Sequence, residues 1–92
     1  MNNNEFTYIK EVAKQKSFSK ASKALGISQP ALSNYIKKLE DRIGVLLFDR
    51  SISPIEITEF GKAYLEYAED VILATDRFND VMSDLQDLKK GE

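Results

Sequence analysis

The 92-residue sequence contains no cysteine and no histidine. The absence of cysteine excludes a disulfide framework and thiolate metal sites, and it fits a reducing compartment. With histidine missing as well, the usual general bases, nucleophiles and transition-metal ligands are lacking. We therefore expect a protein that is not an enzyme and that holds no cofactor and no metal.

Long apolar runs and targeting signals are also missing. No stretch approaches the ~18–20 apolar residues that a membrane span requires. The N-terminal residues "MNNNEFTYIK" do not have the layout of a signal peptide. Hydrophobic residues make up 42% and charged residues 30% of the chain, as in globular proteins. We expect a cytoplasmic protein with no membrane partner, built as one small domain or as a smaller domain with one long element.

An excess of positive charge is lacking overall, with a net charge of −2, but the charges are unevenly distributed along the chain. Residues 1–50 carry nine Lys and Arg against five Asp and Glu, whereas residues 51–92 carry four against ten, which gives net charges of +4 and −6. Between Lys14 and Leu39 there are six lysines and no acidic residue. The basic half can face phosphate while the acidic half points away. Acidic groups tens of ångströms distant weaken such a contact little, because the Debye length is ~8 Å at physiological salt.

The first half of the chain has the pattern of short helices. Residues 4–16 place apolar side chains at helical spacing, namely Phe6, Ile9, Val12 and Ala13. In the next segment, Ser17 or Ser19 can cap a short helix that Gly26 ends. The next cap, Ser28, follows almost at once. Two helices joined by so tight a turn must cross steeply, which is the helix-turn-helix arrangement.

The third helix is expected over residues 28–43, in "SQPALSNYIKKLEDRI". Ser28 is its N-cap, Pro30 lies in the first turn, where a missing N–H costs nothing, and Gly44 ends it. One side of this helix is apolar: Leu32, Tyr35, Ile36, Leu39 and Ile43. The opposite side and its flank are mostly polar: Gln29, Pro30, Ser33, Asn34, Lys37, Lys38 and Asp41.

The remaining residues predict a hairpin and one long helix. Residues 45–50 and 55–58 are rich in β-branched and apolar residues and are separated by a proline-containing turn, so we expect a two-stranded wing. Thr58 then caps a helix over residues 59–88. An apolar stripe runs along it mainly in steps of four and three residues, and no other part of this chain can cover it. We therefore expect a homodimer with the following interface residues: Tyr64, Ala68, Val71, Ile72, Thr75, Phe78, Met82 and Leu85.

The segment "SFSKASKALGISQPALSNYIKKLEDRIGVLLFDR…ITEFG" resembles the N-terminal DNA-binding segment of LysR-type transcriptional regulators, over about residues 5–65. The resemblance implies a mainly α fold: a winged helix-turn-helix of three helices and a two-stranded wing in residues 1–58, followed by a linker and dimerisation helix in residues 59–92. It implies that the third helix enters the major groove of double-stranded DNA. Carried over residue by residue, the DNA-facing positions are Gln29, Pro30, Ser33, Asn34 and Lys37, with Ser17 and Phe18 near phosphate and Arg50 in the wing beside the minor groove.

The chemistry of these side chains agrees with that implication. Glutamine can pair with adenine, and serine and asparagine can donate or accept at several base edges. Lys37 and Lys38 would neutralise phosphates, which gives position and affinity but little sequence information. Ser28 is primarily a cap, with any DNA contact secondary. Glu40 is expected to be a structural ion-pair partner of Arg42 or Arg50.

The sequence departs from the family pattern in three places. The wing "SISPIE" lacks basic residues and contains Glu56, which leaves Arg50 as the main wing contact. Lys16 replaces the usual glycine before the Ser-Phe pair, so it either alters the loop or adds a phosphate contact. The family normally continues into an effector-binding domain, whereas this sequence stops just after the linker helix. It is either an isolated DNA-binding part or a truncated protein, and a small-molecule effector is expected only where that further domain exists.

Two functions remain open from the sequence. The first is a bacterial transcription regulator domain, associated with the nucleoid, that binds an interrupted palindromic operator as a homodimer. The alternative is a protein-interaction module whose long helix pairs with another regulator and blocks it. The basic segment from Lys14 to Leu39 favours the first function, because a pure dimerisation inhibitor needs no face compatible with phosphate.

Overall fold

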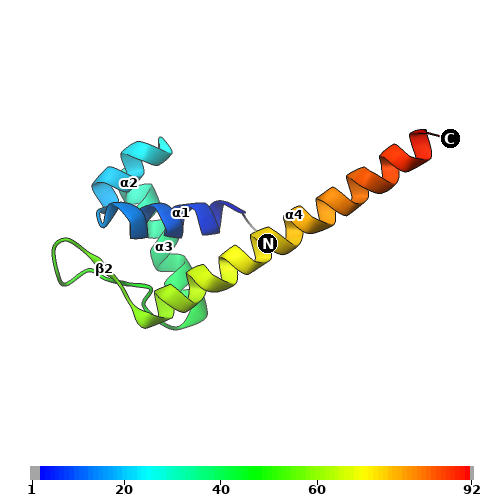
Figure 1. Cartoon of the computed structure of the whole chain (residues 1–92). Helices are drawn as coiled ribbons and strands as arrows, with labels where there is room; N and C mark the ends of the chain where they lie inside the picture. The colour runs from blue at the N-terminus through cyan, green and yellow to red at the C-terminus, as the bar shows by residue number, and fades with distance from the viewer. Residues whose placement is uncertain (1–2, 92) are drawn as a thin grey trace.

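The computed structural model describes residues 3–91, which form four helices and one two-stranded sheet. The elements are α1 (Asn3–Gln15), α2 (Phe18–Leu25), α3 (Gln29–Ile43), β1 (Phe48–Asp49), β2 (Glu56–Ile57) and α4 (Glu59–Lys90). The first three helices and the hairpin gather at one end of α4, whose other end projects away from them (Figure 1). The molecule is therefore elongated, with extents of 60 × 26 × 20 Å. This is the mainly helical, winged arrangement predicted from the sequence.

Local capping interactions set the limits of the first helices. Ser17 caps α2, because its Oγ accepts a hydrogen bond from the Lys20 N–H at 3.1 Å, so the cap is Ser17 rather than Ser19. Ser28 caps α3 through the Ala31 N–H at 3.2 Å. Gly26 and Gly44 end α2 and α3 with φ values of +70° and +87°, a conformation that glycine adopts without steric cost.

The core lies where α1, α2, α3 and the start of the hairpin meet. Its fully buried members come from all of these elements: Ile9, Val12, Ala21, Leu32, Ile36, Leu39, Leu47 and Phe48. The apolar side of α3 is thus mostly confirmed, but Ile43 is a correction. Its side chain is 44% exposed, because no element of residues 3–91 fully covers this side of the last turn of α3.

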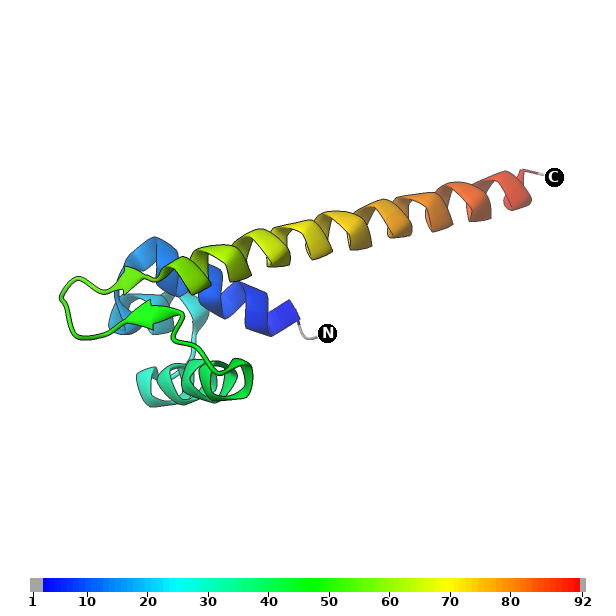
Figure 2. The same ribbon diagram turned by 90° about the horizontal axis from the view of Figure 1, so that it is seen from below.

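The wing is shorter than the sequence predicted. Its strands pair antiparallel with Phe48 opposite Ile57 and Asp49 opposite Glu56, only two residues each. Beyond Asp49 the chain turns away, because the Asp49 carboxylate accepts hydrogen bonds from both the backbone N–H and the hydroxyl of Ser51. The hairpin lies directly beside the first turn of α4 (Figure 2).

The N-terminus of α4 is attached tightly to the loop before β1. The Thr58 hydroxyl donates to the Leu46 carbonyl oxygen at 2.6 Å and accepts from the Gly61 N–H at 3.1 Å. A Cβ at Gly61 would lie 2.3 Å from the Leu47 carbonyl oxygen, so only glycine allows this approach.

Further along α4, every described residue from 72 to 91 is exposed. None of the helices in residues 3–91 combines the length and the hydrophobicity of a membrane span.

Candidate nucleic-acid interface

The outer face of α3 exposes the polar side chains that the sequence singled out. Five of the predicted residues are exposed and Ser33 is half-buried; the exposed ones are Gln29, Pro30, Asn34, Lys37 and Lys38. Behind them, Leu32, Ile36 and Leu39 anchor the helix in the core with at most 2% of each side chain exposed. The helix therefore presents this face on a rigid support, with two lysines and a largely polar surface.

The N-terminus of α2 contributes a second, smaller polar surface. The Ser17 side chain is engaged as the helix cap, and the exposed Lys20 and Lys23 follow it. Phe18 is half-buried and packs edge-on against Phe48, with ring centroids 6.1 Å apart. Phe18 therefore serves packing first, and any nearby phosphate would meet Ser17 and the free N–H groups of this helix end.

A buried carboxylate ties α3 to the wing. The Glu40 side chain is only 3% exposed, and its Oε1 accepts a hydrogen bond from Nη2 of Arg50 at 3.1 Å. Its Oε2 accepts from the backbone N–H groups of Leu47 and Phe48 at 2.7 and 3.3 Å. Of the two partners that the sequence left open, the structure thus selects Arg50. Arg42 instead pairs with Glu5 of α1.

The guanidinium of Arg50 is held on three sides. Besides Glu40, it donates through Nη1 to Oγ of Ser33 at 3.1 Å, and its Cζ lies 4.5 Å from the centre of the Phe18 ring. Its side chain remains 34% exposed, so it borders the surface. Sequence reasoning missed the bond to Ser33, because the two residues are 17 positions apart and no local pattern links them.

Lys16 lies in the turn between α1 and α2. It has a φ of +54°, a left-handed conformation that a residue with a Cβ adopts only at a cost. Its carbonyl oxygen accepts from the Ile55 N–H at 3.3 Å, and its ammonium group lies 3.9 Å from the Glu56 carboxylate. Lys16 thus supports the wing and lies beside its acidic residue.

The predicted stripe on α4 divides into a part covered by its own chain and a part left open. Ala68 is 2% exposed against the domain, so its assignment to a dimer interface is corrected: intramolecular packing already buries it. Tyr64 and Val71 are half-buried, whereas Thr75 is exposed. The large apolar side chains that remain exposed are Phe60, Tyr67, Ile72, Leu73, Phe78, Val81, Met82, Leu85 and Leu88.

Several of these exposed residues follow one helical seam. Counted along α4, the seam alternates steps of four and three residues: Phe60, Tyr64, Tyr67, Val71, Ala74, Phe78, Val81, Leu85 and Leu88. Such spacing is the heptad pattern of helices that pair with another helix. We name these nine positions the α4 seam. Phe60, Tyr67 and Ala74 belong to the seam although they were not part of the apolar stripe predicted from the sequence.

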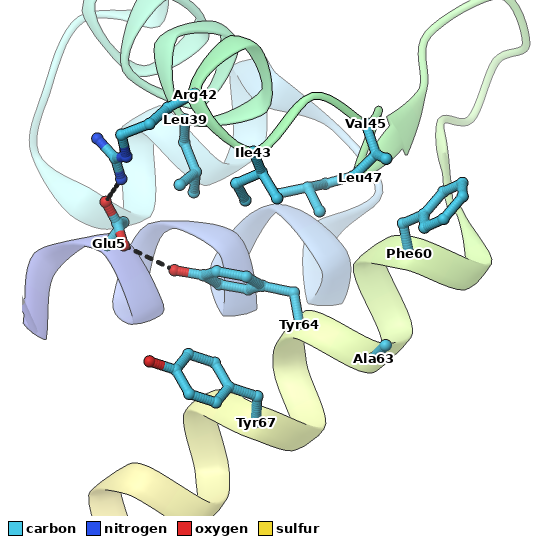
Figure 3. A pocket seen from close by; sticks show the side chains of 10 residues that line it. All are labelled: Glu5, Leu39, Arg42, Ile43, Val45, Leu47, Phe60, Ala63, Tyr64 and Tyr67. Atoms are coloured by element: carbon cyan, nitrogen blue, oxygen red, sulfur yellow. Dashed lines mark hydrogen bonds and ion pairs between the residues drawn. The ribbon is translucent and has the colours of Figure 1, made fainter.

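A groove lies where the seam meets the domain (Figure 3). It has a volume of about 470 Å³ and is walled by the end of α3, the following loop and the first turns of α4. On one side the Tyr64 hydroxyl donates to Glu5 at 2.9 Å, and Glu5 also accepts from Arg42. Burial, and then the hydrogen bond to Glu5, raise the pKa of Tyr64 above its ordinary value. The groove is thus largely apolar, with one hydrogen-bonded polar edge.

Comparison with known proteins gives this arrangement a context. Residues 4–62 match the family model of the bacterial regulatory helix-turn-helix proteins of the lysR family. The chain is 40% identical over 84 residues to the HTH-type transcriptional regulator YcgK of Bacillus subtilis. That alignment covers 91% of this chain but 25% of YcgK, so the chain spans about a quarter of this relative's length.

Solved structures show the same fold. The chain superposes on the BenM DNA-binding domain, solved in complex with catB site 1 DNA, with a TM-score of 0.77 and 31% sequence identity. That superposition covers 87% of this chain and 86% of the BenM chain. The CbnR DNA-binding domain, also solved with DNA, gives a TM-score of 0.76 and 34% identity over 87% of this chain and 92% of that one.

Proposed function

Because the chain belongs to the lysR family of bacterial helix-turn-helix regulators, we propose that it reads a two-fold symmetric operator in double-stranded DNA as a homodimer. It forms the DNA-binding part of such a regulator and is not an enzyme. The observation that carries the proposal is the exposed face of α3, which stands on a buried core and bears polar and basic side chains.

The α3 face suits the major groove. Helix-turn-helix proteins place the N-terminal residues of the recognition helix at base edges. In this chain those residues are Gln29, Pro30, Ser33 and Asn34, which offer an amide pair, an apolar contact and a hydroxyl. We assign base reading to these four side chains, and phosphate contact to Lys37 and Lys38 one turn further on.

Phosphate contacts from outside α3 would fix the docking angle. We assign such contacts to the N-terminal end of α2, where Ser17 and Phe18 begin the helix and Lys20 follows. The partial positive charge of a helix N-terminus favours an anion there. Arg50 has two of its N–H groups bound within the protein, so its contribution to DNA beside the wing rests on its remaining donors.

The dimer would form along the α4 seam. The groove at the domain end and the apolar side chains at the far end, including Leu85 and Leu88, are both uncovered in the described chain. In an antiparallel pair of α4 helices, the far end of each helix would lie beside the groove at the domain end of the other. Because the contact is two-fold symmetric, both surfaces would be covered in both copies. The 32-residue helix is long enough for this, at ~48 Å.

We propose that residues 1–58 contact the DNA and that residues 59–92 form the dimer. Gly61 and Ala68 show that the first turns of α4 also pack against the domain, so the two parts are joined rigidly there. Because the curated relative is about four times as long, we place any small-molecule effector in a further domain of the whole regulator. We place that regulator in the cytoplasm, at the nucleoid.

Selection from a random duplex library at near-physiological salt tests this function. We expect enrichment of an interrupted motif with two-fold symmetry. Gln29→Ala should relax preference at one position in each half-site and cost about 1–3 kcal/mol of binding free energy. Gln86→Ala, an exposed glutamine far along α4, is the matched control and should change nothing. If Gln29→Ala leaves every base preference intact, the assignment of direct reading is wrong.

The exposed apolar α4 seam is also compatible with a second function. That seam would equally suit pairing with the helix of another regulator, which this chain would then block. Mixing the chain with a related full-length regulator and measuring hetero-oligomers at low salt separates the two. Hetero-oligomers that form while no duplex is bound would favour this second function.

A further inference from the structure

The hydrogen bond between Arg50 and Ser33 has a direction. A guanidinium can only donate, whereas a serine hydroxyl has one donor and two acceptor positions. Nη1 of Arg50 therefore donates to Oγ of Ser33, at 3.1 Å. This bond occupies an acceptor position of Ser33 and leaves its single O–H available for another partner.

The guanidinium is too firmly held to turn away from Ser33. Nη2 is bound to Oε1 of Glu40, and the face of the group lies on the ring of Phe18. Glu40 is itself fixed by the backbone N–H groups of Leu47 and Phe48. A planar group with three such contacts has one orientation, so Nη1 stays directed at Ser33.

Ser33 lies at the border between this cluster and the exposed face of α3. It is half-buried, and Gln29 and Lys37, one turn before and one turn after it, are exposed on the same side of the helix. A hydroxyl that accepts a hydrogen bond from a cation is polarised and becomes a stronger donor. The free O–H of Ser33 is thus a donor at the surface that we assign to DNA.

We propose that Ser33 recognises a hydrogen-bond acceptor on DNA and that Arg50 is the positioning residue that makes it a donor. The partner is purine N7, guanine O6, thymine O4 or a phosphate oxygen. The amino groups of adenine and cytosine are donors, and Ser33 disfavours them. This inference rests on the proposed function and adds to it the hydrogen-bonding polarity of one reading position.

The test uses the duplex selected by the wild-type chain, with analogues placed one at a time across a half-site. We use 7-deazapurines to remove N7, 2-aminopurine to remove guanine O6, 5-methyl-2-pyrimidinone to remove thymine O4, and methylphosphonates to remove the charge of single phosphates. One acceptor deletion should weaken wild-type binding roughly 5- to 150-fold, the range of a specific contact. The same deletion should not further weaken Ser33→Ala. A methylphosphonate giving that result identifies phosphate as the source, and a base analogue identifies a base edge.

Two further variants distinguish positioning from a purely structural role. Ser33→Thr keeps the hydroxyl and should retain sensitivity to the same analogue. Arg50→Lys keeps the charge, but one ammonium group cannot make the same fork between Glu40 and Ser33. Arg50→Lys should therefore lose discrimination between the parent duplex and that analogue, whereas a merely structural defect would weaken both alike. Circular dichroism checks that each variant is folded.

The polarity of Ser33 can be overturned independently of Arg50. If deleting an amino group of adenine or cytosine removes the Ser33 contribution, Ser33 is an acceptor and the inference fails. If Ser33→Ala weakens no duplex while Gln29→Ala still relaxes base preference, this inference fails and the proposed function stands. If the wild-type chain enriches no motif at all, the proposed function fails.

Discussion

Arg50 donates from Nη2 to Oε1 of Glu40 at 3.1 Å, an ion pair that joins the wing to the recognition helix. The carboxylate is buried, and both of its oxygens accept hydrogen bonds. Oε2 accepts from the backbone N–H groups of Leu47 and Phe48, at the start of β1. One buried acidic side chain therefore contributes directly to the position of the wing relative to α3.

Replacing that carboxylate should destabilise the fold more than replacing a surface acid. Glu40→Gln keeps the shape but sets an amide against Arg50 or against the backbone N–H groups, because one end of the amide can only donate. We expect a loss of about 2–3 kcal/mol in the free energy of unfolding, measured with urea. Glu59→Gln is the control: its pair with Lys62 is exposed, so the change should be small. Equal effects of the two variants would contradict the assigned role of Glu40.

Lys16 should be a site where glycine stabilises the protein. Its φ of +54° costs a residue with a Cβ free energy that glycine does not lose. We expect Lys16→Gly to raise the free energy of unfolding by about 0.5–1 kcal/mol, since the exposed pair with Glu56 that it removes contributes little. Lys14→Gly, inside α1, should instead lower stability by about 1 kcal/mol. A destabilising Lys16→Gly would show that the contact with the wing matters more than the backbone conformation.

A charge in the α4 seam should separate the proposed dimer. Leu85 is 53% exposed in the single chain, so Leu85→Asp should leave the fold of the monomer intact. In a dimer the new carboxylate would be buried without a partner, and we expect dissociation to become easier by ~100-fold or more. Sedimentation velocity of the wild-type chain and of Ser83→Asp, which adds the same charge on the opposite face, provides the comparison. An unchanged dimer in Leu85→Asp would exclude the seam as the interface.

Lys37 should contribute to affinity without contributing to sequence preference. If it contacts phosphate, Lys37→Ala weakens all duplexes to the same extent and lowers the salt slope of log K by about 1, because one fewer counterion is released. Lys90→Ala, at the far end of α4, removes the same charge away from the proposed interface and should leave the slope unchanged. Binding measured over a range of salt concentrations, with selected and random duplexes, distinguishes the outcomes. A change confined to the selected duplex would make Lys37 a base contact instead.

Tyr64 should make stability depend on alkaline pH. Burial and the bond to Glu5 raise the pKa of Tyr64 in the folded state, so the neutral phenol is favoured there. Its contribution is present below the unfolded-state pKa of ~10 and is lost as the pH rises from that value toward the folded-state pKa. Tyr64→Phe should be less stable than the wild type by ~1 kcal/mol at neutral pH, and the difference should shrink above about pH 10. A difference that stays constant across this range would contradict the sign of the shift.

The helices were predictable because their signals are local. The caps at Ser28 and Thr58, and the left-handed ends at Gly26 and Gly44, depend on the residue itself and on a few neighbours. The wing was predictable in kind but not in length, since Ser51 and Asp49 end the pairing through a side-chain contact. Likewise the apolar periodicity of α3 identified its buried side, apart from Ile43 at the edge of the core.

The sequence by itself thus determined the order of the elements, the exposed face of α3 and the separation of basic and acidic halves. Tertiary structure alone decided three further matters: Ala68 faces its own domain, Glu40 pairs with Arg50 rather than with Arg42, and Ser33 accepts a hydrogen bond from Arg50. Each of these depends on which distant segments meet and at what distance. Helical periodicity shows that a side chain is on an apolar stripe, but only the packed chain shows whether its own domain already covers it.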